Sequence, residues 1–375
     1  MQRLVNHTTG ESYPLDVPIW RSESGALLDL EFTGAFDPME LITRPATLWR
    51  YQEAIPISNP EGIVSFDEGM TPLKKMMVGG RPCLVKLDYL FPSGSYKDRG
   101  STVLMSQAKA IGIQSVVQDS SGNAGASVAT YAALAGIDCE IFVPDSTSPA
   151  KLDQMRAVGA TLNLVPGSRE DTASAALAAA SERYYASHVW NPFFFHGTKT
   201  FAFELSEQME WQVPDTLILP AGNGTLLLGA AIGFEELKQM GITNRIPKLI
   251  GIQTSHCAPL TAAWESGSSV PSSIQTQPTI AEGIAIAEPR RGHQMLQVVK
   301  DSGGKMISVD EGQIVEALRG LCQQGYFVEP TSAAVFAGAI RYCEQAPNDE
   351  KIATVLTGHG LKAAAKIQKL LGASA

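Results

Sequence analysis

The stretch Thr-Leu-Ile-Leu-Pro-Ala-Gly-Asn-Gly-Thr, residues 216–225, decides the fold class because it joins a strand to a helix through a glycine-rich turn. Its apolar start, 216–219, is typical of a buried strand, and residues 225–240 have the length and pattern of a helix. The first backbone N–H groups of such a helix lack partners within it and bind anions such as phosphate. The uncharged run 217–234 is long enough for a membrane span, but its proline and glycines break it, so we predict no membrane segment.

The same alternation of short apolar runs and longer amphipathic ones continues from about residue 82 onward. The expected strands are Cys83–Leu87, Ser115–Gln118, Cys139–Val143, Thr161–Leu164, Thr216–Leu219, Lys248–Gln253, Lys305–Ser308 and Ile352–Leu356. The expected helices are Tyr96–Ile111, Gly125–Ala135, Pro149–Val158, Asp171–Tyr185, Thr225–Met240, Glu311–Gln323, Ser332–Glu344 and Leu361–Leu371. This order predicts an α/β fold with parallel sheets covered by helices and with ligands beyond the carboxyl ends of the strands. Prolines punctuate residues 1–60, which predicts an irregular N-terminal extension.

Composition excludes several classes of function. The chain has 375 residues, enough for two domains or two lobes, and a formal charge of −9 without a basic run, which argues against nucleic acid as a partner. The N-terminal residues lack the apolar core of a signal peptide. The five cysteines form no CxxC pair, which predicts buried reduced thiols in a cytoplasmic protein and no metal site.

A lysine stands at the start of an expected helix in Pro-Ser-Gly-Ser-Tyr-Lys-Asp-Arg-Gly, residues 92–100. The helix dipole makes this end positive and disfavours the ammonium form of Lys97, and a neutral amine is what imine formation with an aldehyde requires. A solvated lysine in a turn is the alternative interpretation.

Three more loops follow expected strands. Residues 119–126, Asp-Ser-Ser-Gly-Asn-Ala-Gly-Ala, offer free N–H groups to a carboxylate, and the Asn123 side chain suits a phenolate oxygen. Residues 222–225 suit a phosphate, whereas a dinucleotide fingerprint would need glycine at position 227, which is Leu227. Thr357, in Thr-Gly-His-Gly at 357–360, presents a neutral hydroxyl at the same sheet edge. An ordinary helix cap remains the alternative for the 119–126 loop and for Thr357.

Together and in this order, the four loops resemble those of fold-type-II pyridoxal-phosphate enzymes (tryptophan synthase β-like), most closely the threonine synthase family. The resemblance covers nearly the whole chain and includes further motifs at 48–51, 67–73, 191–204 and 329–334. It implies two lobes, each with a mainly parallel sheet covered by helices, and a homodimer. Three cofactor roles are implied: Lys97 binds pyridoxal 5′-phosphate as an imine and later shuttles the α-proton, Asn123 bonds the cofactor's 3′-oxygen, and Thr357 faces the pyridine nitrogen. The residues implied to hold the phosphate are Gly222, Asn223, Gly224 and Thr225.

The sequence departs from the threonine synthase pattern where that family binds the phosphate of its substrate. The arginine position is occupied by Phe194 and the Asn-Ser positions by His188 and Val189, with Ala124 and Leu226 as further departures. Burying a phosphate dianion without its arginine is unfavourable, so we expect a substrate with a small or apolar side chain. The expected substrate-binding residues are Ser120, Ser121, Gly122, Asn123, Phe194 and His188.

Residues 279–285, Thr-Ile-Ala-Glu-Gly-Ile-Ala, resemble the pattern of threonine/serine dehydratases instead. In that segment Glu282 either assists proton transfer or caps a turn. A threonine hydroxyl opposite the pyridine nitrogen cannot stabilise a pyridinium as an aspartate would, which favours expulsion of a leaving group over transamination.

These observations predict a pyridoxal-phosphate-dependent lyase. We expect α,β-elimination (dehydratase or ammonia-lyase type) or β-replacement on a small or apolar L-amino acid, through an aminoacrylate intermediate. The alternative is threonine synthase itself, which converts O-phospho-L-homoserine and water to L-threonine and phosphate. Two alternative hypotheses belong to other functional classes: a nicotinamide oxidoreductase, and a homologue that binds a ligand without catalysis. The expected domains are an extension at 1–60, a large cofactor-binding domain at 61–104 plus 205–375, and a small mobile domain at 105–204.

Overall fold

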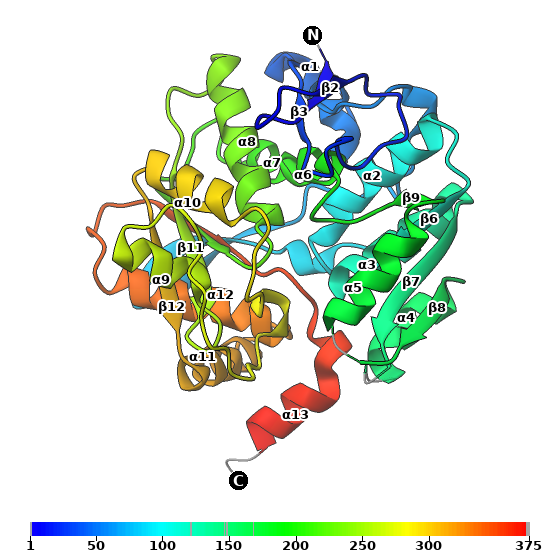
Figure 1. Cartoon of the computed structure of the whole chain (residues 1–375). Helices are drawn as coiled ribbons and strands as arrows, with labels where there is room; N and C mark the ends of the chain where they lie inside the picture. Colours follow the sequence, from blue (N-terminus) through cyan, green and yellow to red (C-terminus); the bar gives the residue numbers. More distant parts are fainter. Residues whose placement is uncertain (1, 121, 146, 148, 168, 373–375) are drawn as a thin grey trace. The chain divides into compact units, whose positions relative to one another are not determined.

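A computed structural model of the chain describes residues 2–120, 122–145, 147, 149–167 and 169–372 (Figure 1). The chain forms two compact units. Unit 1 contains residues 1–70 and 97–200, and unit 2 contains residues 71–96 and 201–375. Residues 1–60 thus share a compact unit with most of the expected small domain, while the division into an extension, a large domain and a mobile small domain stays a prediction.

Unit 1 is built on a parallel sheet. Its described strands run in the order β8 (Thr161–Val165), β7 (Asp138–Pro144), β6 (Ser115–Gln118) and β9 (Tyr184–Tyr185). The helices of unit 1 are α2 (Lys97–Ala110), α3 (Asn123–Ala135), α4 (Pro149–Ala157), α5 (Arg169–Ala179) and α6 (Pro192–Thr198). Helices α3 and α5 pack on β7, and α2 packs between α3 and α6 (Figure 1). Apolar side chains of the strands and of α2 and α3 form one buried cluster.

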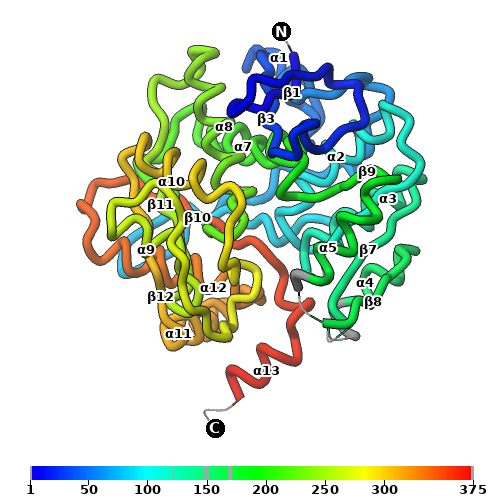
Figure 2. The backbone as a smooth tube through the Cα atoms, viewed as in Figure 1, coloured from blue at the N-terminus to red at the C-terminus, as the bar shows by residue number. Residues whose placement is uncertain are grey.

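The N-terminal part of unit 1 is more ordered than the sequence predicts. Strands β2 (Ser12–Tyr13), β1 (Arg3–Val5) and β3 (Asp29–Glu31) form a small antiparallel sheet (blue in Figure 2). The short helix α1 (Pro38–Leu41) and the 3₁₀ turns η1 (Leu48–Ala54) and η2 (Pro60–Gly62) follow. The Glu11 carboxylate accepts hydrogen bonds from Ser24 and Thr9, which lower the pKa of Glu11 to about 2. These hydrogen bonds stabilise the N-terminal segment, whose strands the sequence did not predict because prolines interrupt it.

Unit 2 is built on a larger, mainly parallel sheet. Its described strands run in the order β12 (Lys305–Val309), β11 (Lys248–Thr254), β10 (Thr216–Pro220), β13 (Ile352–Val355), β5 (Arg81–Lys86) and β4 (Leu73–Val78). Only β4 is antiparallel to its neighbour. The α-helices after α6 are α7 (Thr200–Gln208), α8 (Thr225–Gln239), α9 (Pro259–Ser266), α10 (Gly292–Asp301), α11 (Glu311–Gln323), α12 (Pro330–Cys343) and α13 (Ala364–Gly372). Short 3₁₀ turns, η3 (Asp88–Leu90), η4 (Glu282–Ile284) and η5 (Gly360–Ala363), lie in the connecting loops. The parallel α/β prediction is therefore confirmed.

Most predicted elements lie where the sequence places them, with ends shifted by one or two residues. The main correction concerns 171–185: the helix α5 ends at Ala179, and Tyr184–Tyr185 form β9, which pairs with Val116 and Val117 of β6. The uncharged run 217–234 forms a strand, a loop and a helix, as predicted. No helix of the described chain is long and apolar enough to cross a membrane.

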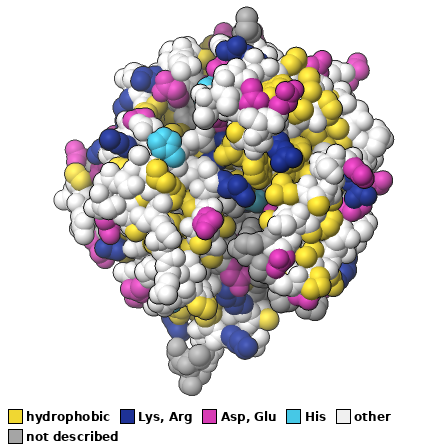
Figure 3. Space-filling view, in the orientation of Figure 1, with side chains coloured by type: hydrophobic (Ala, Val, Ile, Leu, Met, Phe, Trp, Pro, Cys, Tyr) yellow, Lys and Arg dark blue, Asp and Glu magenta, His cyan; other side chains and the backbone are white. Residues whose placement is uncertain are grey.

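One ion pair is wholly enclosed in unit 2. The Lys86 Nζ atom lies 2.9 Å from Glu204 Oε2, and both side chains are fully buried. Lys86 Nζ also donates to the Thr71 carbonyl at 2.6 Å and to Gln208 Oε1 at 2.8 Å. These hydrogen bonds compensate for the loss of hydration that a buried ammonium suffers. At the surface, by contrast, the face in Figure 3 shows positive and negative side chains interspersed, without an extended basic patch among its described residues.

Candidate active site

Lys97 lies at the start of a helix, as predicted: it is the first residue of α2 and is partly buried. Its Nζ atom lies 5.9 Å from the centre of the Phe194 ring. Phe194 is fully buried in α6, and the ring of His188 meets it edge-on with the ring centres 5.9 Å apart. A Cβ atom at Gly100, one turn after Lys97, would come within 2.3 Å of the Phe194 ring. Unit 1 therefore brings Lys97, Phe194 and His188 together, with an apolar ring beside the amine.

The start of α3 packs beside the start of α2. Ser127 Oγ donates to Asp98 Oδ1 at 2.6 Å, and Asp98 follows Lys97 directly. Asn123, the first residue of α3, lies one turn before Ser127 on the same face of the helix. The N-cap of this helix is Gly122, which has no side chain with which to cap it, and the N–H groups at such a helix start suit a carboxylate.

The loop before α3 folds tightly onto the helix. A Cβ at Gly125 would come within 1.8 Å of the Ser120 carbonyl oxygen, so only glycine permits this approach. Ser120 is almost fully buried, and its hydroxyl accepts from Gly122 N at 3.3 Å. The predicted substrate-binding residue Ser121 lies outside the described residues.

The predicted phosphate loop of unit 2 connects β10 to α8. Its N-cap, Gly224, has φ +79°, and a Cβ there would meet Met295 Sδ at 2.4 Å. A Cβ at Gly222 would meet the backbone of Gly283 and Ile284 at 3.0–3.1 Å. The N-cap Gly224 has no side chain with which to cap α8, and Thr225, which begins this helix, is almost fully buried. This glycine-lined helix start has the features that phosphate binding requires.

Thr357 follows β13, which is the parallel neighbour of β10, so the two loops leave the same edge of the sheet. The hydroxyls of Thr357 and Ser332 lie 3.0 Å apart, and Ser332 Oγ also accepts from the Thr357 and Gly358 N–H groups. Thr357 thus presents a neutral hydroxyl held by a buried serine.

A buried hydroxyl near this edge lacks a partner. Ser95 pairs with Gly358 through an isolated β-bridge, and its side chain is fully buried. Its Oγ atom has no hydrogen-bond partner among the described residues. Leaving such a group unsatisfied costs about 1–3 kcal/mol, which a polar ligand would relieve. The glycine-lined loop 222–225 suits a phosphate group. The Ser95 hydroxyl, two residues before Lys97, suits a polar group of a ligand, so together they fit a phosphorylated pyridine aldehyde.

Two weaker sequence candidates are engaged elsewhere. Glu282 begins the 3₁₀ turn η4, and its Oε1 atom pairs with Lys366 Nζ at 2.7 Å with half of the glutamate side chain exposed. His196 is buried, and its Nδ1 atom lies 3.0 Å from Lys199 Nζ. Burial, followed by the Lys199 charge, holds the pKa of His196 well below its usual value of 6.5. These contacts favour structural roles for both residues.

The sequence analysis selected neither Ser95 nor Tyr96 as a site residue. Both precede Lys97, and only their contacts reveal their relevance: the Tyr96 hydroxyl lies 2.8 Å from Thr225 Oγ1, 129 residues further along the chain. The signal available in the sequence was the position of Ser95 and Tyr96, immediately before Lys97.

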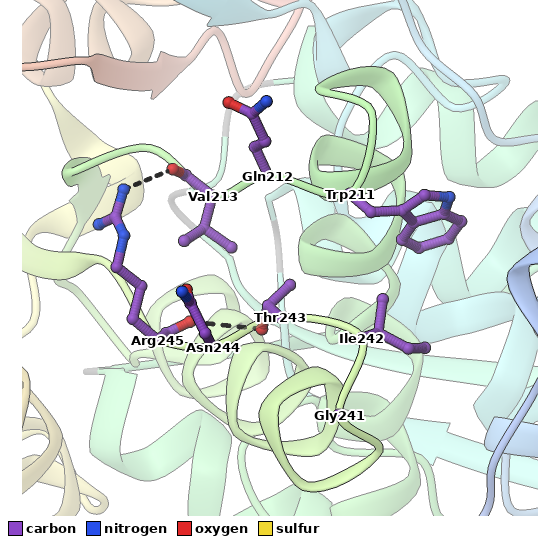
Figure 4. A pocket seen from close by; sticks show the side chains of 8 residues that line it. All are labelled: Trp211, Gln212, Val213, Gly241, Ile242, Thr243, Asn244 and Arg245. Atoms are coloured by element: carbon purple, nitrogen blue, oxygen red, sulfur yellow. Dashed lines mark hydrogen bonds between the residues drawn. The ribbon is translucent and has the colours of Figure 1, made fainter.

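A surface cavity of about 440 Å³ lies elsewhere in unit 2. Figure 4 shows its lining side chains, which are Trp211, Gln212, Val213, Gly241, Ile242, Thr243, Asn244 and Arg245. The lining precedes β10 and β11, so the cavity adjoins the amino ends of these strands, whereas ligands of parallel sheets bind at the carboxyl ends. The Arg245 guanidinium already binds Asp215 and the carbonyls of Val213 and Pro214. This cavity is not the candidate active site.

The comparisons with known proteins fix the family. A family model described as pyridoxal-phosphate dependent enzyme matches residues 64–358. The chain belongs to this family. It is 34% identical to the threonine synthase of Methanocaldococcus jannaschii, over 96% of this chain and 93% of that one. It is 32% identical to the threonine synthase of Methanosarcina acetivorans, over 94% and 90% of the two chains.

Solved structures confirm the fold. Maize serine racemase superposes with a TM-score of 0.70 at 22% identity, covering 81% of this chain and 92% of that one. The processed threonine deaminase isoform 2 of Solanum lycopersicum superposes with a TM-score of 0.69 at 22% identity, covering 96% of both chains. The expectations of a fold-type-II architecture, of pyridoxal 5′-phosphate as cofactor and of a lyase-type enzyme resembling threonine synthase are therefore confirmed.

Proposed function

We propose that this enzyme eliminates or replaces the β-substituent of a small or apolar L-amino acid. Pyridoxal phosphate supplies, when bound, the electron sink that stabilises negative charge at the substrate's Cα. The neutral Thr357 hydroxyl, held by Ser332, suits a ring that is not kept protonated. This favours loss of a β-leaving group over transamination, with a 2-oxo acid or a β-substituted amino acid as product.

The residues of unit 1 have distinct roles in this proposal. Lys97 Nζ would hold the cofactor and would also be the group that takes the proton from the substrate's Cα. The N–H groups at the start of α3, with Ser120, Ser121 and Gly122, bind the substrate carboxylate. The Asn123 side chain donates to the cofactor's 3′-oxygen. In unit 2, the loop from Gly222 through Asn223 and Gly224 to Thr225 holds the cofactor's phosphate.

The position of Phe194 is the observation that supports a small or apolar substrate side chain. Its buried ring lies beside Lys97 Nζ and under the first turn of α2, where the threonine synthase resemblance would place an arginine. Val189 and Ala124 are also buried and offer no side-chain donor. A phosphate dianion in such surroundings would lose its hydration without gaining hydrogen bonds. A small or apolar substrate side chain carries no such cost, and His188 is the polar group expected to contact it.

The second candidate is threonine synthase activity on O-phospho-L-homoserine. The relatives that carry this name cover almost the whole chain at 32–34% identity, which is the observation in its favour. In this case the substrate's phosphate is bound by residues other than Phe194 and Val189.

A substrate comparison separates the two candidates. The purified, cofactor-loaded protein is assayed with O-phospho-L-homoserine for threonine and phosphate, and with L-serine, L-threonine and bulkier β-substituted amino acids for 2-oxo acid or β-replacement products. We expect turnover only in the second set. Efficient threonine formation would instead establish the second candidate. The Lys97→Ala variant is the control, since it should lose both turnover and the visible absorbance of the lysine-bound cofactor.

We also propose a cytoplasmic homodimer. The family resemblance supports the dimer, and the five free cysteines suit a reducing compartment. Light scattering coupled to size exclusion should give twice the chain mass of 40.0 kDa, and a monomer peak would refute the dimer.

A further inference from the structure

Tyr96 connects the two loops that leave the carboxyl edge of the unit 2 sheet. Its backbone N–H donates to the Thr357 carbonyl at 3.0 Å. Its hydroxyl, at the other end of the side chain, lies 2.8 Å from Thr225 Oγ1 at the start of α8. Tyr96 is partly buried and Thr225 almost fully so, which shields this hydrogen bond from water. The residue before the cofactor lysine is therefore fixed at both of its ends.

The direction of the Tyr96–Thr225 hydrogen bond decides what Thr225 can offer a ligand. A threonine hydroxyl has one proton and rotates freely, and a phosphate dianion accepts hydrogen bonds but donates none. If Tyr96 donates to Thr225 Oγ1, the Thr225 proton points away from Tyr96. A hydrogen bond from that proton to an ionised oxygen is stronger than one between neutral groups.

We propose that Tyr96 is a positioning residue for the cofactor's phosphate: its hydroxyl donates to Thr225 Oγ1 and turns the Thr225 hydroxyl proton toward the phosphate. The inference rests on the proposed phosphate loop and names a residue outside it. The Tyr96 hydroxyl acts through Thr225 and touches neither substrate nor the reacting atoms. A phenylalanine at 96 would keep the ring and the backbone contact with Thr357 but remove the hydroxyl that lies against Thr225 Oγ1.

The test compares binding of pyridoxal 5′-phosphate and of pyridoxal, which lacks the phosphate, to the apoprotein. For Tyr96→Phe we expect a three- to tenfold higher Kd for pyridoxal phosphate, the effect of about one hydrogen bond, and an unchanged Kd for pyridoxal. The ³¹P resonance of the bound cofactor should shift relative to the wild type. A merely structural role would weaken both ligands alike, and that result would overturn the proposal, as would an unchanged Kd for both.

A second tyrosine provides a matched control. The Tyr342 hydroxyl lies 3.2 Å from Thr216 Oγ1, at the first residue of β10, and also donates to Glu350 Oε1 at 2.9 Å. Tyr342→Phe therefore removes a tyrosine–threonine contact, and one further hydrogen bond, at the opposite end of the same strand. We expect this variant to bind pyridoxal phosphate as the wild type does. A loss equal to that of Tyr96→Phe would show that the effect is general destabilisation and would overturn the proposal.

The Thr225→Val variant separates this inference from the proposed phosphate loop. If it weakens pyridoxal phosphate and the further change Tyr96→Phe adds nothing, the two residues act as one unit, as proposed. If Thr225→Val weakens the cofactor and Tyr96→Phe alone does not, the inference about Tyr96 fails and the loop assignment stands. If Thr225→Val leaves the Kd unchanged, the Thr225 hydroxyl does not bind the phosphate and the inference about Tyr96 fails, while the loop assignment is tested by Gly224→Ala.

Discussion

The contact between Gly100 and Phe194 can be tested by adding a single methyl group to the helix that begins with Lys97. A Cβ atom at position 100 would lie 2.3, 2.4 and 2.6 Å from three carbons of the Phe194 ring. Real Cβ atoms do not come this close, and Phe194 is fully buried, so the ring cannot move into solvent. In Gly100→Ala either the ring or α2 must shift.

The expected magnitude follows from two opposing contributions. Alanine stabilises the interior of a helix by about 1 kcal/mol relative to glycine, because it restricts the unfolded chain. Overpacking a close-packed core costs about 1–3 kcal/mol, and the short distances at position 100 place the cost at the upper end. We therefore expect Gly100→Ala to lower the free energy of unfolding by about 1–2 kcal/mol. In Gly320→Ala, within α11, a Cβ meets nothing within 4 Å, so only the stabilising contribution remains.

Urea denaturation of the apoproteins, followed by circular dichroism, measures both variants with an unchanged m-value as the condition for comparison. We expect the midpoints of Gly100→Ala and Gly320→Ala to move in opposite directions. Replacing the Phe194 ring with the smaller leucine side chain should reduce the effect of the added methyl group. Gly100→Ala should therefore lower the free energy of unfolding less in a Phe194→Leu protein than in the wild type. A Gly100→Ala protein as stable as Gly320→Ala would refute the packing of Phe194 beneath the Lys97 helix.

Three further changes test other parts of the molecule. Lys86→Met removes the ammonium group beside the buried Glu204 carboxylate and should cost about 3–5 kcal/mol in urea denaturation. Lys86→Met/Glu204→Leu should recover most of this loss, and equal losses would contradict an enclosed pair. Because the pKa of His196 is lowered, its contribution to stability is complete above pH 6.5 and falls by about 1.4 kcal/mol per unit as the pH drops below that value. His196→Asn should flatten the dependence of unfolding free energy on pH between 7 and 5.5, and an unaltered slope would refute a buried neutral imidazole. Gly224→Ala, strained at φ +79° and against Met295, should raise the Kd for pyridoxal phosphate, measured by absorbance titration, by tenfold or more; unaltered affinity would argue against this loop as the phosphate site.

Local signals carried most of the fold prediction. The strand, turn and helix of 216–239 follow from an apolar run and adjacent glycines, and Lys97 lies at a helix start as its sequence context indicates. The alternation of such units determines the parallel sheets, because a parallel connection requires a crossover. The roles of the individual site residues stay predictions, since they depend on bound molecules.

Features that depend on distant partners were missed. The β4 strand lies at an edge of the sheet and exposes Lys74 and Lys75, so its sequence lacks the apolar run of a central strand. Tyr184 and Tyr185 continue a helix-like pattern, yet they pair with β6 because that sheet has room for another strand. The Tyr96–Thr225 contact joins residues whose proximity only the folded sheet creates.

A cofactor site built, as proposed, from the glycine-lined loop 222–225 and the buried Ser95 hydroxyl would also make the enzyme's lifetime depend on the supply of pyridoxal phosphate. A site that exists only in the folded chain stabilises that chain whenever it is filled, by about 2.7 kcal/mol when the free cofactor is at a hundred times its Kd. That corresponds to about a hundredfold fewer unfolded molecules at equilibrium. Since proteases degrade unfolded chains, a cell short of pyridoxal phosphate would lose the protein itself and not only its activity.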